Sequence, residues 1–122
     1  MLPKSQRLNL KKDFKWVAAG KKLETTRPSS GGKYLKLFIR FGENEKPRVG
    51  VALSGKNFKK AVERNRARRI VSQAFQTLYS SLPNNINIMA LPKTGVLEVK
   101  SGDVLSDLET ALKDKNLLIA EP

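Results

Sequence analysis

The chain has 122 residues, 39% hydrophobic and 29% charged, which indicates one folded domain over residues 1–122 with a single core. It contains no Cys and no His, which excludes the usual zinc ligands, a cysteine nucleophile and the commonest general base. The net charge is +13, and residues 1–75 carry 20 basic and 5 acidic side chains against 4 and 6 in the remainder. A field of this sign attracts polyanions, usually nucleic acid, with an anionic membrane surface as the alternative.

The first predicted element is a short helix in the segment "NLKKDFKWVAAG". Asn9 is placed to cap its start, and Gly20 lies just past its end. Helical spacing brings four apolar residues onto one face: Leu10, Phe14, Val17 and Ala18. The residues before this helix are too charged for the apolar part of a signal peptide, so we expect a cytoplasmic protein.

A loop and two strands are predicted next. The segment "TTRPSSGGK", residues 25–33, is rich in Pro, Ser and Gly and predicts a flexible loop insertion. Residues 34–41 and 48–54 both alternate in polarity around the turn "GENEKP", which predicts a β-hairpin. One face of the first strand is apolar, with Leu35, Leu37, Ile39 and Phe41, and the other carries Tyr34, Lys36, Phe38 and Arg40. The second strand directs Val49, Val51 and Leu53 to the core, opposite Gly50, Ala52 and Ser54.

The second half of the chain predicts a long helix, a buried strand and a final helix. Residues 58–82 carry a helical apolar stripe, formed by Ala67, Val71, Ala74, Phe75, Leu78 and Leu82. The segment "INIMAL", residues 86–91, is short, apolar and β-prone. Residues 103–113 form the last helix, with Val104, Leu105, Leu108, Ala111 and Leu112 as its apolar positions. The predicted order is α, β, β, α, β, α.

The long helix begins with a concentration of cations, "KKAVERNRARR". A solvated basic face is the ordinary interpretation of such a run. Here Glu63 is the only acid between residues 58 and 82, and adjacent like charges cost a helix a few tenths of a kcal/mol per pair. An anionic partner such as phosphate accounts for them, because the planar fork of Arg holds two phosphate oxygens. Asn65 can both donate and accept, so it suits a base edge or a 2′-hydroxyl.

Three other groups of residues are candidates for a functional site. Tyr34 and Phe38, separated by cations, would suit stacking of single-stranded bases, or would simply be covered by the first helix. A lone Trp16 near a helix end is typical of packing. Two carboxylate pairs, Glu43 with Glu45 and Asp103 with Asp107, could in principle hold Mg²⁺ for phosphodiester cleavage, although acids are common in turns and at helix starts.

The segments "RVGVALS", "KKAVERNRARR" and "SQAF" together resemble the protein component of bacterial ribonuclease P, whose mark is an Arg-Asn-x-x-Lys/Arg-Arg core in a helix after a strand. The resemblance extends to "RLNLKKDFKWV" and weakly to "NINIMALPK" and the last helix, leaving out the loop of residues 25–33. It implies an α+β fold, a two-layer sandwich of the ribosomal protein S5 domain 2 type, with a central sheet and a left-handed βαβ crossover, contrary to the usual right-handed rule.

The resemblance also implies a function. In that family a large RNA is the catalyst and uses Mg²⁺, held mainly by the RNA, to remove the 5′ leader of precursor tRNA. The protein is a non-catalytic subunit with no metal site and no small-molecule substrate. It binds the ribonuclease P RNA through its basic helix and the leader in a groove between the first helix and the sheet.

Residue by residue, the resemblance assigns two sites. The RNA-binding set is Lys56, Lys60, Arg64, Asn65, Arg66, Arg68 and Arg69. The leader groove is Phe14, Tyr34, Lys36, Phe38 and Arg40. This chain departs from the family pattern at Ser72, where an Arg is usual, at Ala18, where a second groove Phe is frequent, and by one extra residue before the basic helix. The alternative function is a general ribosomal-type RNA-binding protein, and a third is a stand-alone endonuclease.

Overall fold

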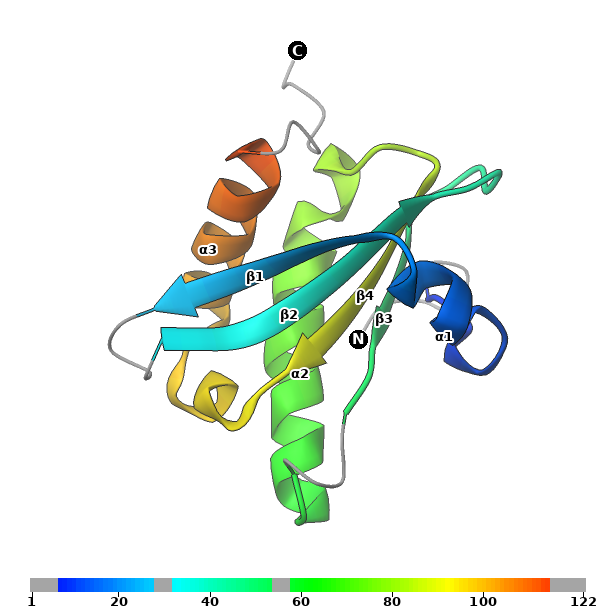
Figure 1. The fold of residues 1–122 in the computed structure, drawn as a ribbon. Helices are drawn as coiled ribbons and strands as arrows, with labels where there is room; N and C mark the ends of the chain where they lie inside the picture. Colours follow the sequence, from blue (N-terminus) through cyan, green and yellow to red (C-terminus); the bar gives the residue numbers. More distant parts are fainter. Residues whose placement is uncertain (1–6, 28–31, 54–57, 115–122) are drawn as a thin grey trace.

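The computed structural model describes residues 7–27, 32–53 and 58–114, and within them three α-helices and one four-stranded sheet (Figure 1). The helices are α1 (Leu10–Ala18), α2 (Ala61–Leu78) and α3 (Ser101–Asp114). The strands are β1 (Lys21–Arg27), β2 (Gly32–Phe41), β3 (Arg48–Val51) and β4 (Ile86–Pro92). Two 3₁₀ turns follow α2 and β4, at Tyr79–Ser81 and Thr94–Glu98.

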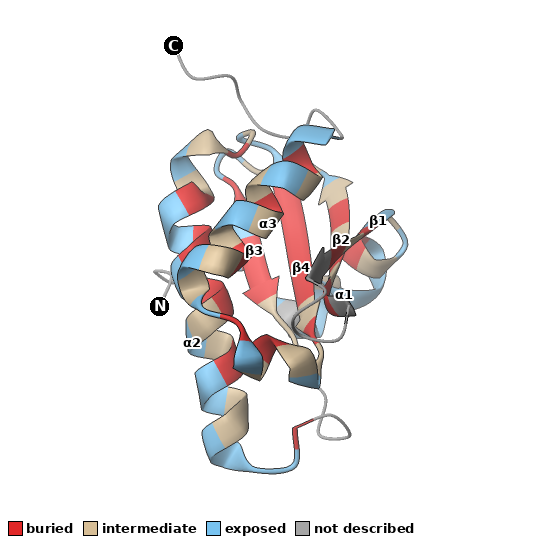
Figure 2. Cartoon of the chain, turned by 90° about the vertical axis from the view of Figure 1, so that its left-hand side faces the viewer, coloured by how far each residue is buried: buried red, intermediate tan, exposed pale blue. Residues whose placement is uncertain are grey.

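The sheet separates two layers of helix. Its strand order is β1-β2-β4-β3, with β3 and β4 parallel and the other neighbours antiparallel. Helices α2 and α3 lie side by side over one face, where the main core is buried (Figures 1 and 2). Helix α1 lies on the opposite face, where Leu8, Val17 and Met89 form a second, smaller buried cluster. The expected two-layer sandwich therefore has a partial third layer.

Three helices form at the predicted places, although α2 covers Ala61–Leu78 instead of residues 58–82, and Phe14, predicted on the apolar face of the first helix, is 42% exposed. The Asn9 side chain accepts a hydrogen bond from the Lys12 backbone N–H at 3.3 Å and so caps α1. Gly20 follows the end of this helix. A Cβ atom at this position would overlap the Ile39 carbonyl oxygen, so glycine allows β1 to begin beside β2. The residues of the apolar stripe predicted for the long helix are all buried: Ala67, Val71, Ala74, Phe75 and Leu78 in α2, and Leu82 after the 3₁₀ turn that follows it.

The predicted hairpin is wrong. Strand β2 pairs with β1 and β4, and β3 pairs with β4. The apolar segment "INIMALP" takes the position between β2 and β3 because it is buried on both faces, which a central strand requires. The loop expected at residues 25–33 is also partly wrong, since residues 25–27 complete β1 and residues 32–33 begin β2. The rest of that loop lies outside the described residues.

Tyr34 does not lie on the face predicted for it. The register between β1 and β2 shifts at Thr25/Thr26, where Thr25 pairs with Leu35 but Thr26 pairs with Lys33. Tyr34 is the extra residue of this β-bulge, which redirects its side chain into the main core beneath α3. Its ring is fully buried, and its hydroxyl donates to the Asp107 carboxylate at 2.5 Å. Tyr34 is thus part of the core and not of a groove.

The N-terminal turns of α2 extend past the end of the sheet (Figures 1 and 2). The C-terminal turns are held against the sheet, where the Tyr79 hydroxyl donates to the Pro47 carbonyl at 2.7 Å and burial raises the pKa of this phenol. One helix therefore has a buried half that fixes its position and a projecting half that exposes side chains on several of its sides.

Candidate nucleic-acid interface

The projecting half of α2 carries most of the residues predicted to bind RNA. Four are exposed, namely Lys60, Asn65, Arg66 and Arg69, and Arg64 and Arg68 are half-buried. Lys60 and Arg64 lie on the same helical line as the buried Leu78, and they reach solvent because the sheet ends before this part of the helix. Lys56 lies outside the described residues.

Arg64 has a structural contact of its own. One of its guanidinium nitrogens, Nη1, donates to the Phe58 carbonyl at 2.8 Å and to the Lys59 carbonyl at 3.3 Å. Lys60, at the N-cap position, makes no side-chain capping bond. Arg64 therefore ties the chain before α2 to its first turns, and any contact with a ligand would use the rest of the guanidinium.

Asn65 and Arg68 are neighbours on the helix surface, and the Arg68 Nη1 donates to the Asn65 Oδ1 at 3.3 Å. This contact engages the amide oxygen of Asn65, whose amide nitrogen is a hydrogen-bond donor. Arg66 and Arg69 project from the solvent side of the helix. Together these side chains present a cationic surface with one polar amide, which suits phosphate oxygens and an adjacent base or ribose hydroxyl.

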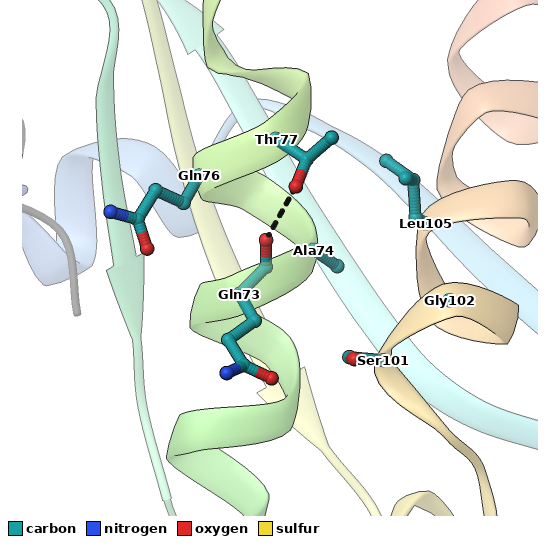
Figure 3. A pocket seen from close by; sticks show the side chains of 7 residues that line it. All are labelled: Gln73, Ala74, Gln76, Thr77, Ser101, Gly102 and Leu105. Carbon is teal, nitrogen blue, oxygen red and sulfur yellow. Dashed lines mark hydrogen bonds between the residues drawn. The ribbon is translucent and has the colours of Figure 1, made fainter.

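The cationic surface ends after Arg69. The family resemblance predicts an Arg at the position of Ser72. The Ser72 side chain is only 5% exposed, so it cannot contact a large ligand. The exposed positions beyond it in α2 are uncharged, namely Gln73, Gln76 and Thr77. A hollow of about 420 Å³ lies here between α2 and α3, lined by Gln73, Ala74, Gln76, Thr77, Ser101, Gly102 and Leu105 (Figure 3).

The predicted leader groove lies on the opposite face of the sheet. The register places Phe38 beside Met89 and Lys36 beside Leu91, so these four side chains share the face on which α1 packs. Phe38 packs partly against the cluster beneath α1, Lys36 is half-buried, and Phe14 of α1 is 42% exposed. The structure thus brings three predicted groove residues to one face and removes Tyr34 from it.

Arg40, the fifth predicted groove residue, is held at the far end of α1. Its Nη1 donates to the Trp16 carbonyl at 3.0 Å, and its guanidinium carbon lies 4.8 Å from the centre of the Trp16 ring. Phe14 and Trp16 are two positions apart, which separates them by about 160° around a helix. Helix α1 therefore presents Phe14 on one flank and the Trp16–Arg40 pair on the other.

Sequence reasoning missed a second depression on the Trp16 flank. We call it the Trp16 depression; its volume is about 830 Å³, and it is lined by Lys12, Asp13, Trp16, Phe41, Gly42, Glu43, Asn44, Arg48 and Asn87. Phe41 was predicted to point into the core, yet it is 45% exposed because it is the last residue of β2. In the sequence, the isolated Trp16 is the only residue that could have indicated a site here, and its ordinary interpretation is packing.

The candidate metal ligands do not gather into a site. In residues 7–27, 32–53 and 58–114 there is no group of three or more acidic side chains able to hold a metal ion. Asp107 instead accepts the hydroxyl of Tyr34. Within these same ranges, no helix is both long and apolar enough to cross a bilayer.

Comparison with known sequences gives one consistent family. The family profile described as Ribonuclease P matches residues 2–116. The ribonuclease P protein component of Pseudanabaena sp. is 33% identical over 97% of each chain, and that of Methylococcus capsulatus is 33% identical over 88% of this chain and 78% of its own. The corresponding protein of Pseudoalteromonas atlantica is 40% identical over 51% of each chain, so that alignment spans about half its length.

Solved structures agree with this result. The RNase P protein from Thermotoga maritima, in complex with 1-(4-fluorophenyl)-2-thiourea, has a TM-score of 0.71 and 26% identity, over 88% of this chain and 97% of that chain. The RNase P protein from Staphylococcus aureus has a TM-score of 0.68 over 100% of this chain and 98% of that chain, and at 19% identity it supports the fold alone. The chain belongs to the bacterial ribonuclease P protein component family.

Proposed function

We propose that this chain is the protein subunit of a ribonuclease P holoenzyme that assists the RNA-catalysed, Mg²⁺-dependent removal of the 5′ leader from precursor tRNA. Its partners are the catalytic ribonuclease P RNA and the precursor tRNA. The observation that carries the proposal is the projecting half of α2, whose cations include the family's Arg-Asn-x-x-Arg-Arg core at residues 64–69. The chemistry belongs to the RNA, and the protein contributes binding.

The basic half of α2 is proposed to bind the catalytic RNA. Arg66 and Arg69 face solvent, and Arg68 and Asn65 are held together beside them. Arginine suits this role because its guanidinium keeps its charge and can engage two phosphate oxygens. The buried half of α2 fixes the backbone from which these groups project, so binding of the RNA requires no ordering of that backbone.

The face of the sheet beside α1 is proposed to bind the single-stranded leader. Phe14 is exposed on α1, and Phe38 and Lys36 lie two positions apart on the same face of β2. Aromatic rings stack on bases at roughly 1–3 kcal/mol each, while a lysine follows the phosphates. The family resemblance also implies a left-handed crossover from β3 through α2 to β4, and we propose that handedness here.

The Mg²⁺ ions of the reaction are proposed to be held mainly by the RNA. The carboxylates considered from the sequence do not fit a protein site, because Asp107 is engaged by Tyr34 and no acidic group of three forms among the described residues. Glu43 and Glu45 lie in the turn after β2. No step of the reaction is therefore assigned to a carboxylate of the protein.

Reconstitution with a bacterial ribonuclease P RNA at low Mg²⁺ tests this function. We expect the protein to increase the rate of leader removal from precursor tRNA, because its cations replace part of the screening that Mg²⁺ supplies. Absence of stimulation with the cognate RNA, despite tight RNA binding, would favour the general RNA-binding protein. Cleavage by the protein without the RNA would instead favour the stand-alone endonuclease.

A further inference from the structure

The Trp16 depression is separate from the predicted leader groove. It lies on the flank of α1 that carries Lys12 and Trp16, over the ends of β2, β3 and β4. Phe14 projects from the other flank. Its volume of about 830 Å³ falls within the roughly 300–1,000 Å³ typical of sites for small ligands.

Two large aromatic side chains line this depression and remain in contact with solvent. Trp16 is 36% exposed and Phe41 is 45% exposed. The buried contact between α1 and the sheet is made by Val17 together with Leu8 and Met89. Exposed aromatic area that does not stabilise the fold is available for stacking on a flat apolar ligand.

The position of Trp16 is fixed by its surroundings. Arg40 holds its backbone carbonyl at 3.0 Å and places its guanidinium carbon 4.8 Å from the ring centre. A Cβ at Gly42 would lie 2.9 Å from the Trp16 Cη2 atom, so the ring occupies space that only glycine leaves. A ring held in place loses little entropy when it stacks on a ligand.

The floor of the depression is also rigid and polar. Asn87 donates through Nδ2 to the Asn44 Oδ1 at 2.8 Å and to the Arg40 carbonyl at 3.2 Å. Asn44 in turn donates to the Lys46 carbonyl at 2.6 Å. These bonds fix the ends of β2 and β4 relative to one another beneath the aromatic pair.

Charged groups of both signs surround the aromatic pair. Lys12 and Arg48 are exposed and can reach a phosphate, whereas Asp13 and Glu43 can accept from amino groups. A phosphate alone would use only the cations, and an apolar ligand would use only the rings. One nucleotide uses all three features.

We propose that the Trp16 depression binds one unpaired RNA nucleotide, with its base stacked on Trp16 and Phe41 and its phosphate at Lys12 or Arg48. Whether that nucleotide comes from the leader or from the catalytic RNA rests on the proposed function. The binding itself does not depend on the proposed function, since it requires only a single-stranded RNA.

The test uses the fluorescence of Trp16, the only tryptophan of the chain. The full-length protein is titrated with a short oligoadenylate at about 0.3 M salt, where backbone binding is weakened. We expect saturable quenching of Trp16, and none with an abasic oligonucleotide of the same length. Equal quenching by the abasic strand, or no quenching by oligoadenylate at saturation, would overturn the proposal.

A matched pair of variants locates the site. Phe41 lines the Trp16 depression and is 45% exposed, whereas Gln73 is exposed on α2, which packs on the other face of the sheet. Phe41→Ala should weaken the quenching titration roughly 5- to 100-fold, whereas Gln73→Ala should leave it within about twofold. An affinity unchanged by Phe41→Ala would show that the quenching ligand does not stack on Phe41, against the proposal. Thermal unfolding of both variants verifies that they fold.

Three further titrations identify the source of the nucleotide. The protein is mixed with precursor tRNA, mature tRNA or the catalytic RNA, each at saturation. Quenching by precursor but not mature tRNA assigns the nucleotide to the leader, and quenching by the catalytic RNA assigns it there. Because oligoadenylate binding is measured without the catalytic RNA, failure of this site and failure of the proposed function are distinguishable.

Discussion

At the scale of single residues, the position of Tyr34 shows how one irregularity changes a site. Period-two alternation places this residue beside Lys36 and Phe38, and the bulge between β1 and β2 turns it to the other face. There its buried hydroxyl donates to Asp107 of α3. A tyrosine expected to stack on RNA instead fastens α3 to the sheet.

The structure therefore predicts that Tyr34→Phe affects stability and not RNA binding. Removing the hydroxyl deprives a carboxylate of a buried donor, so the free energy of unfolding should fall by about 1–3 kcal/mol. Denaturant titration measures this loss, and the affinity for precursor tRNA should not change. A selective loss of affinity for leader-bearing substrates would contradict the placement of Tyr34.

Tyr79→Phe is the matched control for that measurement, because it removes the other tyrosine hydroxyl of the chain. The Tyr79 hydroxyl donates to a neutral acceptor, the Pro47 carbonyl, at 2.7 Å. Its loss should cost about 0.5–1.5 kcal/mol, less than the loss of a bond to a charged acceptor. A larger cost at Tyr79 than at Tyr34 would show that the Asp107 contact adds little.

At the scale of elements, α2 divides into a buried half that positions it and a projecting half that is proposed to bind RNA. Its cations are not equivalent. Arg64 bonds two backbone carbonyls ahead of the helix, whereas Arg66 and Arg69 project to solvent. Binding and structural roles can therefore be separated by substitution within one helix.

We expect Arg66→Ala and Arg69→Ala each to weaken binding of the catalytic RNA and to lower the slope of log K against log salt by about one unit. Their melting temperatures should stay near that of the parent protein. Arg64→Ala should weaken binding and also lower the melting temperature, because the Phe58 and Lys59 carbonyls lose a donor.

Gln76→Ala provides the control on the same helix, since Gln76 is exposed but uncharged. It should leave the salt slope unchanged, whatever its effect on affinity. An unchanged salt slope in both Arg66→Ala and Arg69→Ala would show that neither side chain neutralises a phosphate. That result would contradict the proposed RNA interface on α2.

At the scale of the whole molecule, the sheet separates two proposed RNA surfaces. Helix α2 presents its cations from one face, and Phe14, Lys36 and Phe38 lie on the other. Phe38 also packs against the cluster beneath α1, so its removal would loosen that helix. Phe14, being exposed, is the cleaner probe of leader binding.

Because the two surfaces lie on opposite faces of the sheet, their effects should add. Phe14→Ala should raise the KM of the holoenzyme for precursor tRNA with a leader, and Arg69→Ala should weaken assembly with the catalytic RNA. When all three variants are compared by the same quantity, such as the kcat/KM of the holoenzyme for precursor tRNA, the free-energy change of the double variant should equal the sum of the two single changes within about 0.5 kcal/mol. Coupling clearly larger than this, measured by a double-mutant cycle, would mean that one RNA strand spans both surfaces.

Local features of this protein follow from its sequence. The capped first helix, the apolar stripe of α2, the burial of residues 86–91 apart from the half-buried Leu91, and the cationic start of α2 are confirmed. These features depend on side chains a few positions apart in one element, where helix and strand periodicity act directly. The composition alone gives the net charge of +13, and this charge indicates a polyanionic partner.

The tertiary structure alone decided which strands pair and what each face presents. Strand β4 separates β2 from β3, a bulge turns Tyr34 away from the groove, and α1 divides the outer face so that Arg40 joins Trp16. The physical reason is that strand register and helix docking are set by contacts distant in sequence, which periodicity does not specify. The Trp16 depression and the face shared by Lys36 and Phe38 exist only because those distant contacts form.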